Sequence, residues 1–302
     1  MPGASKCGMQ YNAQSLTAET GADVENGSKS MRVYSVRAWL IAIAIALAAP
    51  SAPAAELRVM AAGSLKEVFT AAFADYSRQY GQSFAPVWGP SGVLRERLKN
   101  GEAFDIFASA ALPHAQALTE AGVSGPSVLF ARNALCIVTD AGRPLIGANL
   151  AETLLKPDIR IGTSTPVADP AGDYTWEVFH LIDAQRPGAF DILSKKAQQL
   201  FGGAATPGQV NGRPRWLAAL DDHEIDLLII YCSIAKQIVR DQPNYKSVEL
   251  PPQLSVGPEY GLTVSRNAAP GAADFAMYLL SPQGQSSLKA FGFIPIALPA
   301  SK

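Results

Sequence analysis

The sequence predicts an α/β protein made of two lobes, each with a mostly parallel sheet covered by helices. Short, apolar, β-branched runs alternate with segments whose apolar residues recur at helical spacing, and this order is typical of parallel sheets. The alternation continues through a second half of similar length without an obvious linker. We therefore expect crossing strands to join the lobes, with residues 55–133 plus 255–302 in the first lobe and 134–254 in the second.

The first half is expected to contain three pairs of a strand and a helix. Its strands are LRVMAA (57–62), SFAPVW (83–88) and FDIFAS (104–109). The helices follow them at 65–76, 93–99 and 113–122. In the first helix, Leu65, Phe69 and Tyr76 belong to a set of apolar residues that repeats every three to four positions, so they mark one buried face.

The second half is expected to repeat this order less regularly. Its strands are ALCIVT (134–139), IRIGTS (159–164), IDLLIIY (225–231) and YGLTVS (260–265). Helices are expected at 173–184 and 215–221, and two short ones within 272–291. Residues 201–214 are rich in glycine and proline, and we interpret them as a loop.

The N-terminus predicts export. Residues 39–49 form an uninterrupted apolar run, which Arg32 and Arg37 precede and Ala52-Pro53-Ala54 follows. A basic end, a short apolar core and small residues at a cleavage site are the parts of a secretory signal. The run is too short to span a bilayer. We expect cleavage after Ala54 and a mature protein in the periplasm, and we treat residues 1–54 as an N-terminal extension plus signal peptide.

Composition argues against several classes of function. The formal net charge is −1, without blocks of like charge, so nucleic acid and anionic membranes are not expected partners. The three histidines have no metal-ligand spacing, and neither a nucleophile elbow nor a phosphate-binding glycine loop occurs. We therefore expect a protein that is not an enzyme and has no cofactor.

Two cysteines, Cys136 and Cys232, remain after the expected cleavage. Both lie in apolar, strand-like runs, and we interpret them as buried thiols that pack as small hydrophobic side chains. A disulfide between them is the alternative, because an oxidising compartment permits one.

Candidate binding residues lie where strands of the first half end and helices begin. Ligands of open α/β sheets bind beyond the carboxyl ends of the strands. Ser64 and Ser91 each begin a helix at such a junction, and Ser109 ends a strand. Unpaired N–H groups and the helix dipole make two such starts a site for an anion. The alternative for Ser64 is local, because S-x-x-E (64–67) is also a capping box.

The second half offers a turn and a tyrosine. Asp169-Pro170-Ala171-Gly172-Asp173 leads into a helix, where Asp169 and Asp173 suit capping roles. A sharper hypothesis makes one of them the hydrogen-bond acceptor for a protonated ligand. Tyr231 ends a buried strand, from which its hydroxyl can reach a cleft.

The motifs AAGSLKEVF, GPSGVLRERLKNGEAFDIFASA, DPAGDY, LIIYC and SPQGQSSLKAFGF, in this order, resemble the periplasmic molybdate-binding protein family of ABC importers. The resemblance covers residues 56–298. It implies a type II periplasmic binding fold, in which the ligand is held in a cleft between two lobes. It also implies a membrane permease as partner and a monomeric protein.

The resemblance also implies a set of ligand contacts. Hydroxyl groups of Ser64, Ser91 and Tyr231 and the backbone amide of Ala171 should donate to the oxyanion. A further amide is expected near Val210 and Asn211. The charged turn at 169–173 and the length of the 201–214 loop depart from the family pattern.

The leading hypothesis for the ligand is molybdate or tungstate. These dianions only accept hydrogen bonds, so a pocket of donors suits them. The alternatives are phosphate, sulfate or a small organic anion on the same fold, or a ligand sensor without a permease. Phosphate retains a proton and requires an acceptor, so a carboxylate of Asp169 or Asp173 in the cleft would favour it.

Overall fold

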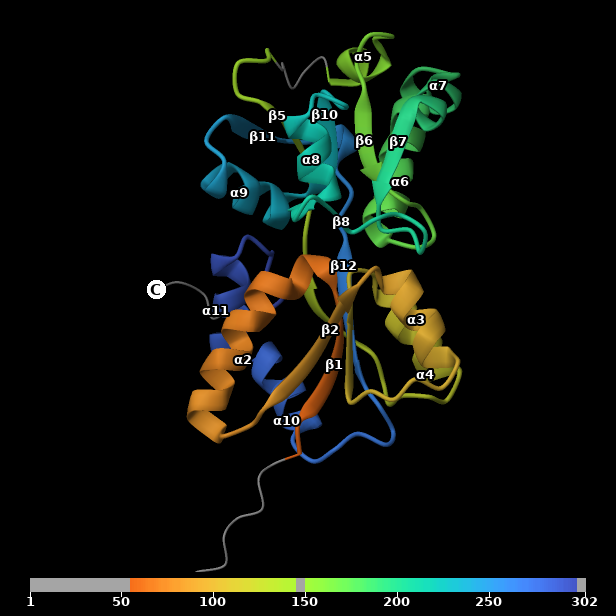
Figure 1. The fold of residues 1–302 in the computed structure, drawn as a ribbon. Helices are drawn as coiled ribbons and strands as arrows, with labels where there is room; N and C mark the ends of the chain where they lie inside the picture. Colours follow the sequence, from red (N-terminus) through yellow and green to blue (C-terminus); the bar gives the residue numbers. More distant parts are fainter. Residues whose placement is uncertain (1–54, 145–149, 298–302) are drawn as a thin grey trace, which may run out of the picture. The chain divides into compact units, whose positions relative to one another are not determined.

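Two separate five-stranded sheets form the centres of the two lobes (Figure 1). The computed structural model describes residues 55–144 and 150–297, so the expected extension and signal peptide lie outside the described residues. The strand order is β2-β1-β3-β12-β4 in the first sheet and β11-β5-β10-β6-β7 in the second. A two-stranded hairpin, β8-β9, accompanies the second sheet.

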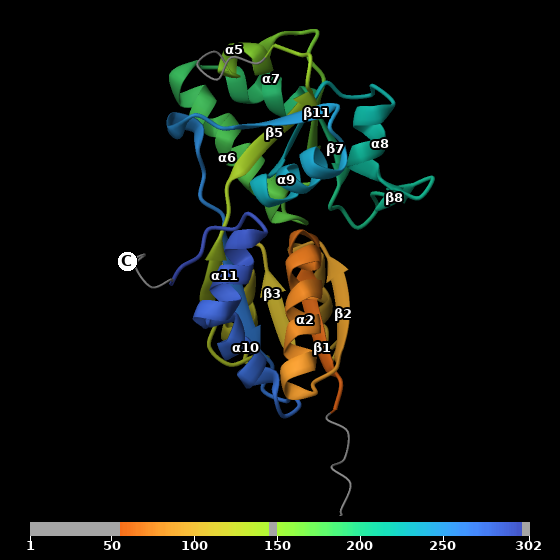
Figure 2. The same ribbon diagram turned by 90° about the vertical axis from the view of Figure 1, so that its left-hand side faces the viewer.

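The first lobe follows the predicted alternation closely. Its strands are β1 (Leu57–Ala62), β2 (Phe84–Gly89), β3 (Ile106–Ser109), β4 (Val128–Arg132) and β12 (Glu259–Val264). Its helices are η1 (Gly63–Leu65), α2 (Lys66–Tyr80), α3 (Ser91–Lys99), α4 (Leu112–Glu120), α10 (Ala272–Leu280) and α11 (Pro282–Ala290). In β1, Val59 faces the cluster that includes Phe69 of α2, whereas Met60 faces the cluster that includes Leu94 of α3. Helices therefore cover both faces of this sheet, with α3 and α4 on one face (Figure 1) and α2, α10 and α11 on the other (Figure 2).

The second lobe has the same layered construction. Its strands are β5 (Leu135–Asp140), β6 (Ile161–Ser164), β7 (Ala197–Phe201), β10 (Leu227–Tyr231) and β11 (Tyr245–Glu249). Its helices are α5 (Leu150–Leu155), α6 (Pro170–Gln185), α7 (Ala189–Lys196), α8 (Arg215–Asp221) and α9 (Cys232–Asp241). In β10, Ile229 packs in the same cluster as Phe179 of α6, and Ile230 packs with Leu220 of α8. Successive side chains of β10 therefore point to opposite faces of the sheet, and helices bury both faces.

The expectation of mostly parallel sheets is confirmed, with one opposing strand in each sheet. β1 is parallel to β2 and β3, and only β12 is antiparallel to its neighbours β3 and β4, so four of the five strands share one direction. Likewise β6 is parallel to β7 and β10, and only β5 is antiparallel to its neighbours β10 and β11. The opposing strand of each sheet is the one that follows a crossover. Residues 133–134 join β4 to β5 and residues 250–258 join β11 to β12, so the chain enters each sheet against the direction of the other strands.

The 201–214 segment is not a plain loop. It contains the hairpin of β8 (Gln209–Val210) and β9 (Arg213–Pro214). The two turn residues, Asn211 and Gly212, both have left-handed backbone angles, with φ of 51° and 76°. Asn-Gly is the dipeptide that two-residue hairpin turns favour, so the local sequence carried this signal.

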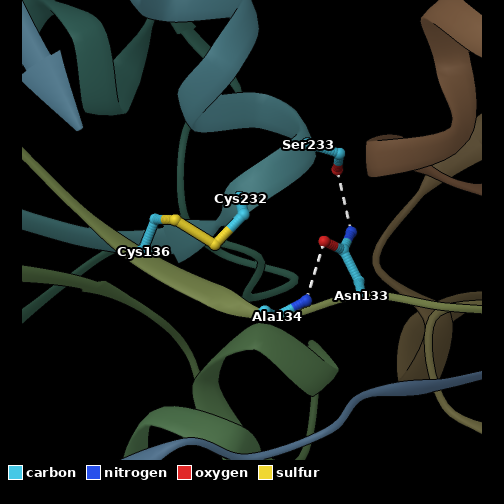
Figure 3. Close-up of a disulfide and its surroundings, with 5 residues drawn as sticks. All are labelled: Asn133, Ala134, Cys136, Cys232 and Ser233. Carbon is cyan, nitrogen blue, oxygen red and sulfur yellow. Dashed lines mark hydrogen bonds between the residues drawn. A yellow bond between two sulfur atoms is a disulfide. The ribbon is translucent and has the colours of Figure 1, made fainter. Parts of the chain in front are cut away.

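Cys136 and Cys232 form a disulfide, and the interpretation as two thiols is wrong (Figure 3). Their Cα atoms are 4.8 Å apart. The register of β5 against β10 places Cys136 opposite Ile230, and Cys232 follows two residues later as the first residue of α9. The bond therefore fixes the chain immediately after Tyr231 to the beginning of β5.

Asn133 connects the lobes at the first crossover. Its side-chain N–H donates to Ser233 Oγ at 2.8 Å and to the Tyr260 hydroxyl at 3.2 Å. Its carbonyl oxygen accepts from the backbone of Ala134 at 2.9 Å (Figure 3). Tyr260 belongs to β12 and Ser233 to α9, so one buried amide contacts an element of each lobe.

Among the described helices, none combines the length and the apolar character that crossing a membrane requires.

Replacing both Cys136 and Cys232 with Ala should lower the free energy of unfolding by about 2–4 kcal/mol. The bond closes a loop with a sequence separation of 96 residues, so its loss frees the unfolded chain. Chemical denaturation with and without a reductant measures the effect. A reductant should destabilise the wild-type protein and leave the double variant unchanged. Equal midpoints for the wild-type protein under both conditions would contradict the prediction.

Candidate functional site

A cleft of about 960 Å³ is lined by residues of both lobes. The first lobe contributes the ends of β1 and β2 and the beginning of α2. The second contributes the beginning of α6, the segment from Phe201 to Trp216, the end of β10 and part of α9. Three of the four main candidates, Ser64, Ala171 and Tyr231, line this cleft together with Asp169.

Ser64 lies directly after β1 and does not cap its helix. It belongs to η1, and no side chain caps the start of η1 or of α2. Its hydroxyl is instead 2.9 Å from the hydroxyl of Tyr260. Glu67, the other half of the expected capping box, accepts a hydrogen bond from Arg240. The capping-box alternative is therefore wrong, and the Ser64 hydroxyl is held at the floor of the cleft by Tyr260.

Tyr231 carries a buried hydroxyl that lacks a hydrogen-bond partner among the described residues. Its side chain is 2 % exposed, and its ring lies 5.7 Å from that of Tyr260. Burial raises its pKa well above the usual value, and the neighbouring Tyr260 and Asp169 add to the rise. The group therefore stays protonated and remains a donor. A buried hydroxyl without a partner is costly unless a bound molecule completes it.

Asp169 is the N-cap of α6 and also lines the cleft. Its Oδ1 accepts the backbone N–H of Ala171 at 3.4 Å, and its Oδ2 accepts the hydroxyl of Ser164. The amide of Ala171, which we expected to serve a ligand, thus points at a carboxylate of its own turn. Burial raises the pKa of Asp169, although the bonds from Ser164 and Ala171 oppose this effect.

Gly202 leaves free the space that the Asp169 carboxylate occupies. It follows β7 with a left-handed φ of 83°, and a Cβ atom there would lie 2.7 Å from Asp169 Oδ2. A side chain at this position would displace the carboxylate. Gly202 also lines the cleft, and it lies in the segment that we interpreted only as a loop.

Ser91 and Ser109 do not line the cleft. Ser91 is fully buried at the start of α3, and its Oγ accepts the backbone N–H of Ala110 at 3.0 Å. Ser109 exchanges two hydrogen bonds with Ala111 in its own turn. Both hydroxyls shape the loop after β3. Gly89 and Pro90, which precede Ser91, are the residues of this junction that line the cleft.

Val210 and Asn211 also lie outside the lining. They sit at the tip of the β8-β9 hairpin, where Asn211 is exposed. The residues at either side of the hairpin, Gly208 and Pro214, line the cleft instead. The donor expected near 210–211 stays a prediction, and neither residue lines the cleft in this structure.

The sequence argument missed the aromatic walls and the charges of the cleft. Trp88, at the end of β2, and Trp216, in α8, both line it. Lys66 is the one basic side chain among the described lining residues, and Glu67 is paired with Arg240 of α9 at 2.8 Å. Trp88 precedes the Gly89-Pro90 turn, so its place next to a strand-to-helix junction was the available signal.

A sequence profile described as bacterial extracellular solute-binding protein matches residues 57–294. This chain belongs to that family. An uncharacterized protein of Pasteurella multocida (strain Pm70) is 32% identical to this chain over 244 residues, which cover 79% of this chain and 98% of the relative.

Solved structures show the same fold. The periplasmic molybdate-binding protein of Azotobacter vinelandii is similar with a TM-score of 0.65 and 19% identity, covering 81% of this chain and 100% of that chain. A sulfate-binding protein from Mycobacterium tuberculosis H37Rv is similar with a TM-score of 0.67 and 16% identity, covering 80% of this chain and 87% of that chain. The type II periplasmic binding fold expected for this solute-binding protein is confirmed.

The Asp169→Asn variant of this protein should become more stable than the wild-type protein by an amount that grows as the pH rises. Burial raises the pKa of Asp169 above its usual value, so the wild-type protein loses stability as the pH rises through the raised pKa. Asparagine keeps the helix cap but carries no charge. Denaturation of both proteins at several pH values between about 3 and 7 gives the difference in unfolding free energy.

Asp191→Asn makes the same chemical change at an exposed position in the first turn of α7 and supplies the baseline. A difference for Asp169→Asn that stays constant with pH would show that burial does not favour the protonated carboxyl.

Proposed function

We propose that this protein captures a solute with a tetrahedral oxyanion group in the periplasm and delivers it to the membrane permease of an ABC importer. The observation that carries the proposal is the buried hydroxyl of Tyr231, which finds no hydrogen-bond partner among the described residues and belongs to a side chain that lines the same cleft as Ser64. Membership of the solute-binding family supports capture rather than catalysis.

An anion leaves water only where donors replace its hydration shell. Ser64 and Tyr231 supply hydroxyl groups, and the start of η1 and α2 supplies backbone N–H groups that have no helical partner. Lys66 adds a positive charge at the same end of α2. Because Ser64 belongs to the first lobe and Tyr231 to the second, a ligand that bonds to both favours the arrangement in which the lobes meet.

Molybdate and tungstate are the first candidates, from the sequence resemblance and from the molybdate-binding protein of Azotobacter vinelandii. These ions carry no proton at neutral pH, so an ionised Asp169 would repel them. Their binding therefore requires Asp169 to hold its proton and donate it to a hydrogen bond. Sulfate carries no proton at neutral pH either, so it also requires a protonated Asp169. The structural neighbour from Mycobacterium tuberculosis is named as a sulfate-binding protein.

A phosphate group is the second candidate, and Asp169 is the specific observation that favours it. Hydrogen phosphate retains a proton, and an ionised carboxylate in the cleft accepts a hydrogen bond from it. The position of the Asp169 carboxylate suits this role, because Ser164 donates to one of its oxygens and the Ala171 N–H donates to the other. Gly202 leaves room for it.

Calorimetric titration with molybdate, tungstate, sulfate and phosphate tests the function and the choice of ion. Asp169→Asn separates the candidates, because its Oδ1 keeps the bond from the Ala171 N–H while its side-chain NH₂ can donate to a ligand oxygen but cannot accept a proton from the ligand. The variant should bind molybdate and sulfate about tenfold or more tightly than wild type at neutral pH and should bind phosphate more weakly by a similar factor. Heat from none of the four ions would contradict the proposed oxyanion site.

Tyr231→Phe should weaken binding of the oxyanion by about 10- to 100-fold, because a hydrogen bond to a charged group is worth about 1.5–3 kcal/mol. The ligand-free variant should be as stable as wild type or more stable, because it loses a buried hydroxyl that has no partner within residues 55–144 and 150–297.

Tyr245→Phe is the matched control. The Tyr245 hydroxyl donates to Asp221 outside the cleft, so this change should lower stability and leave affinity intact. Equal affinities of Tyr231→Phe and wild type would exclude Tyr231 as a ligand contact.

A further inference from the structure

The cleft is much larger than a bare oxyanion requires. Four oxygen atoms around one centre fill no more than about four water volumes, or about 120 Å³ at about 30 Å³ for each water. The cleft measures about 960 Å³, which is a volume typical of sites for larger organic ligands. Most of this space therefore lies beyond the reach of one oxyanion group.

The additional space extends along α2. Glu67, Thr70, Ala71 and Ala74 line the cleft as well as Ser64. These helical positions are spaced by three or four residues, so they form one stripe on the helix surface. Ten residues of helix rise by about 15 Å, so the lining reaches about that far from Ser64.

The polarity of the side chains that line the cleft changes along α2. Near Ser64 the lining presents hydroxyl groups, a helix start and Lys66. Elsewhere it presents mainly apolar and aromatic side chains, namely Trp88, Phe201, Trp216, Ile230, Ile234 and Phe291. Thr70 gives its hydroxyl hydrogen to the carbonyl of Lys66, so it has no free donor for a ligand. A bare ion would leave these apolar walls in contact with water.

The lobes already touch beside the cleft. The backbone N–H of Gly92 in α3 donates to the carbonyl of Ala168 at 3.0 Å, and Arg240 of α9 pairs with Glu67 of α2 at 2.8 Å. The volume of the cleft is therefore that of an arrangement in which the lobes are in contact, and it does not result from their complete separation.

We propose that the ligand is an organic molecule with one tetrahedral oxyanion group and an apolar, planar body. This inference rests on the proposed function, because the oxyanion group occupies the end of the cleft with Ser64 and Tyr231. The body extends along α2 and covers the walls that carry Trp88 and Trp216, which removes apolar surface from water. A free ion in the same site gains none of that burial.

Phenyl phosphate and inorganic phosphate are the probes, because they share the oxyanion group and differ in the body. Calorimetric titration of the full mature protein should show that phenyl phosphate binds about tenfold or more tightly than phosphate, since burying a phenyl ring is strongly favourable. Molybdate, tungstate and sulfate are titrated in the same series.

Ala74→Trp fills the far part of the cleft and leaves Ser64 and Tyr231 unchanged. Ala74 is exposed, so the helix accommodates the larger side chain. The variant should bind phenyl phosphate at least about tenfold more weakly than wild type and should bind phosphate equally well. Ala71→Trp is a second variant of the same kind. Ala121→Trp adds the same side chain at an exposed position outside the cleft and should change neither affinity.

The outcomes separate the two proposals. If phosphate, molybdate or tungstate binds as tightly as phenyl phosphate, or if both tryptophan variants bind phenyl phosphate like wild type, the organic body is refuted and oxyanion capture stands. If none of the five probes binds, the oxyanion site itself is refuted.

Discussion

The proposed function depends on the cost of removing an anion from water. A negative charge can be buried only where enough donors surround it, and one sheet edge cannot supply them from all sides. The chain meets this constraint by forming two lobes whose junctions between strand and helix line a shared cleft. Ser64 follows β1 in the first lobe and Tyr231 ends β10 in the second. Two short crossovers keep these groups close while the sheets remain separate.

Rigid support behind the donors is the second requirement. The hydroxyl of Ser64 is held by Tyr260, and Tyr260 also accepts from Asn133 at the crossover. On the other side, the disulfide attaches the first residue of α9 to β5, directly after Tyr231. The two hydroxyls of the site are therefore presented by backbone that is fixed in each lobe, so ligand affinity is not reduced by ordering of these segments.

The sequence predicted the strands and helices whose patterns are local. LRVMAA, IDLLIIY and the helix after Ser64 have strong apolar periods and lie where expected. It did not predict β11, in which Tyr245 alone is buried, or α9, which starts directly after β10 without a turn residue to mark it. The register of β5 against β10 brings Cys136 and Cys232 together, and such long-range pairing has no local signal. For the same reason the sequence could not place Trp216 in the cleft or remove Ser91 from it.

The close approach of Gly202 to Asp169 and Ser164 links positions that are distant in sequence. Residue 202 is restricted by its left-handed backbone and by both side chains, because an added Cβ would meet Asp169 Oδ2 and, nearer still, Ser164 Oγ. A homologue that exchanges Asp169 for a smaller neutral residue loses one of these restrictions and keeps the other two. Glycine at 202 should therefore persist in homologues that keep Ser164 and this backbone, and a chain that also keeps Asp169 is expected to share the ligand chemistry of this protein.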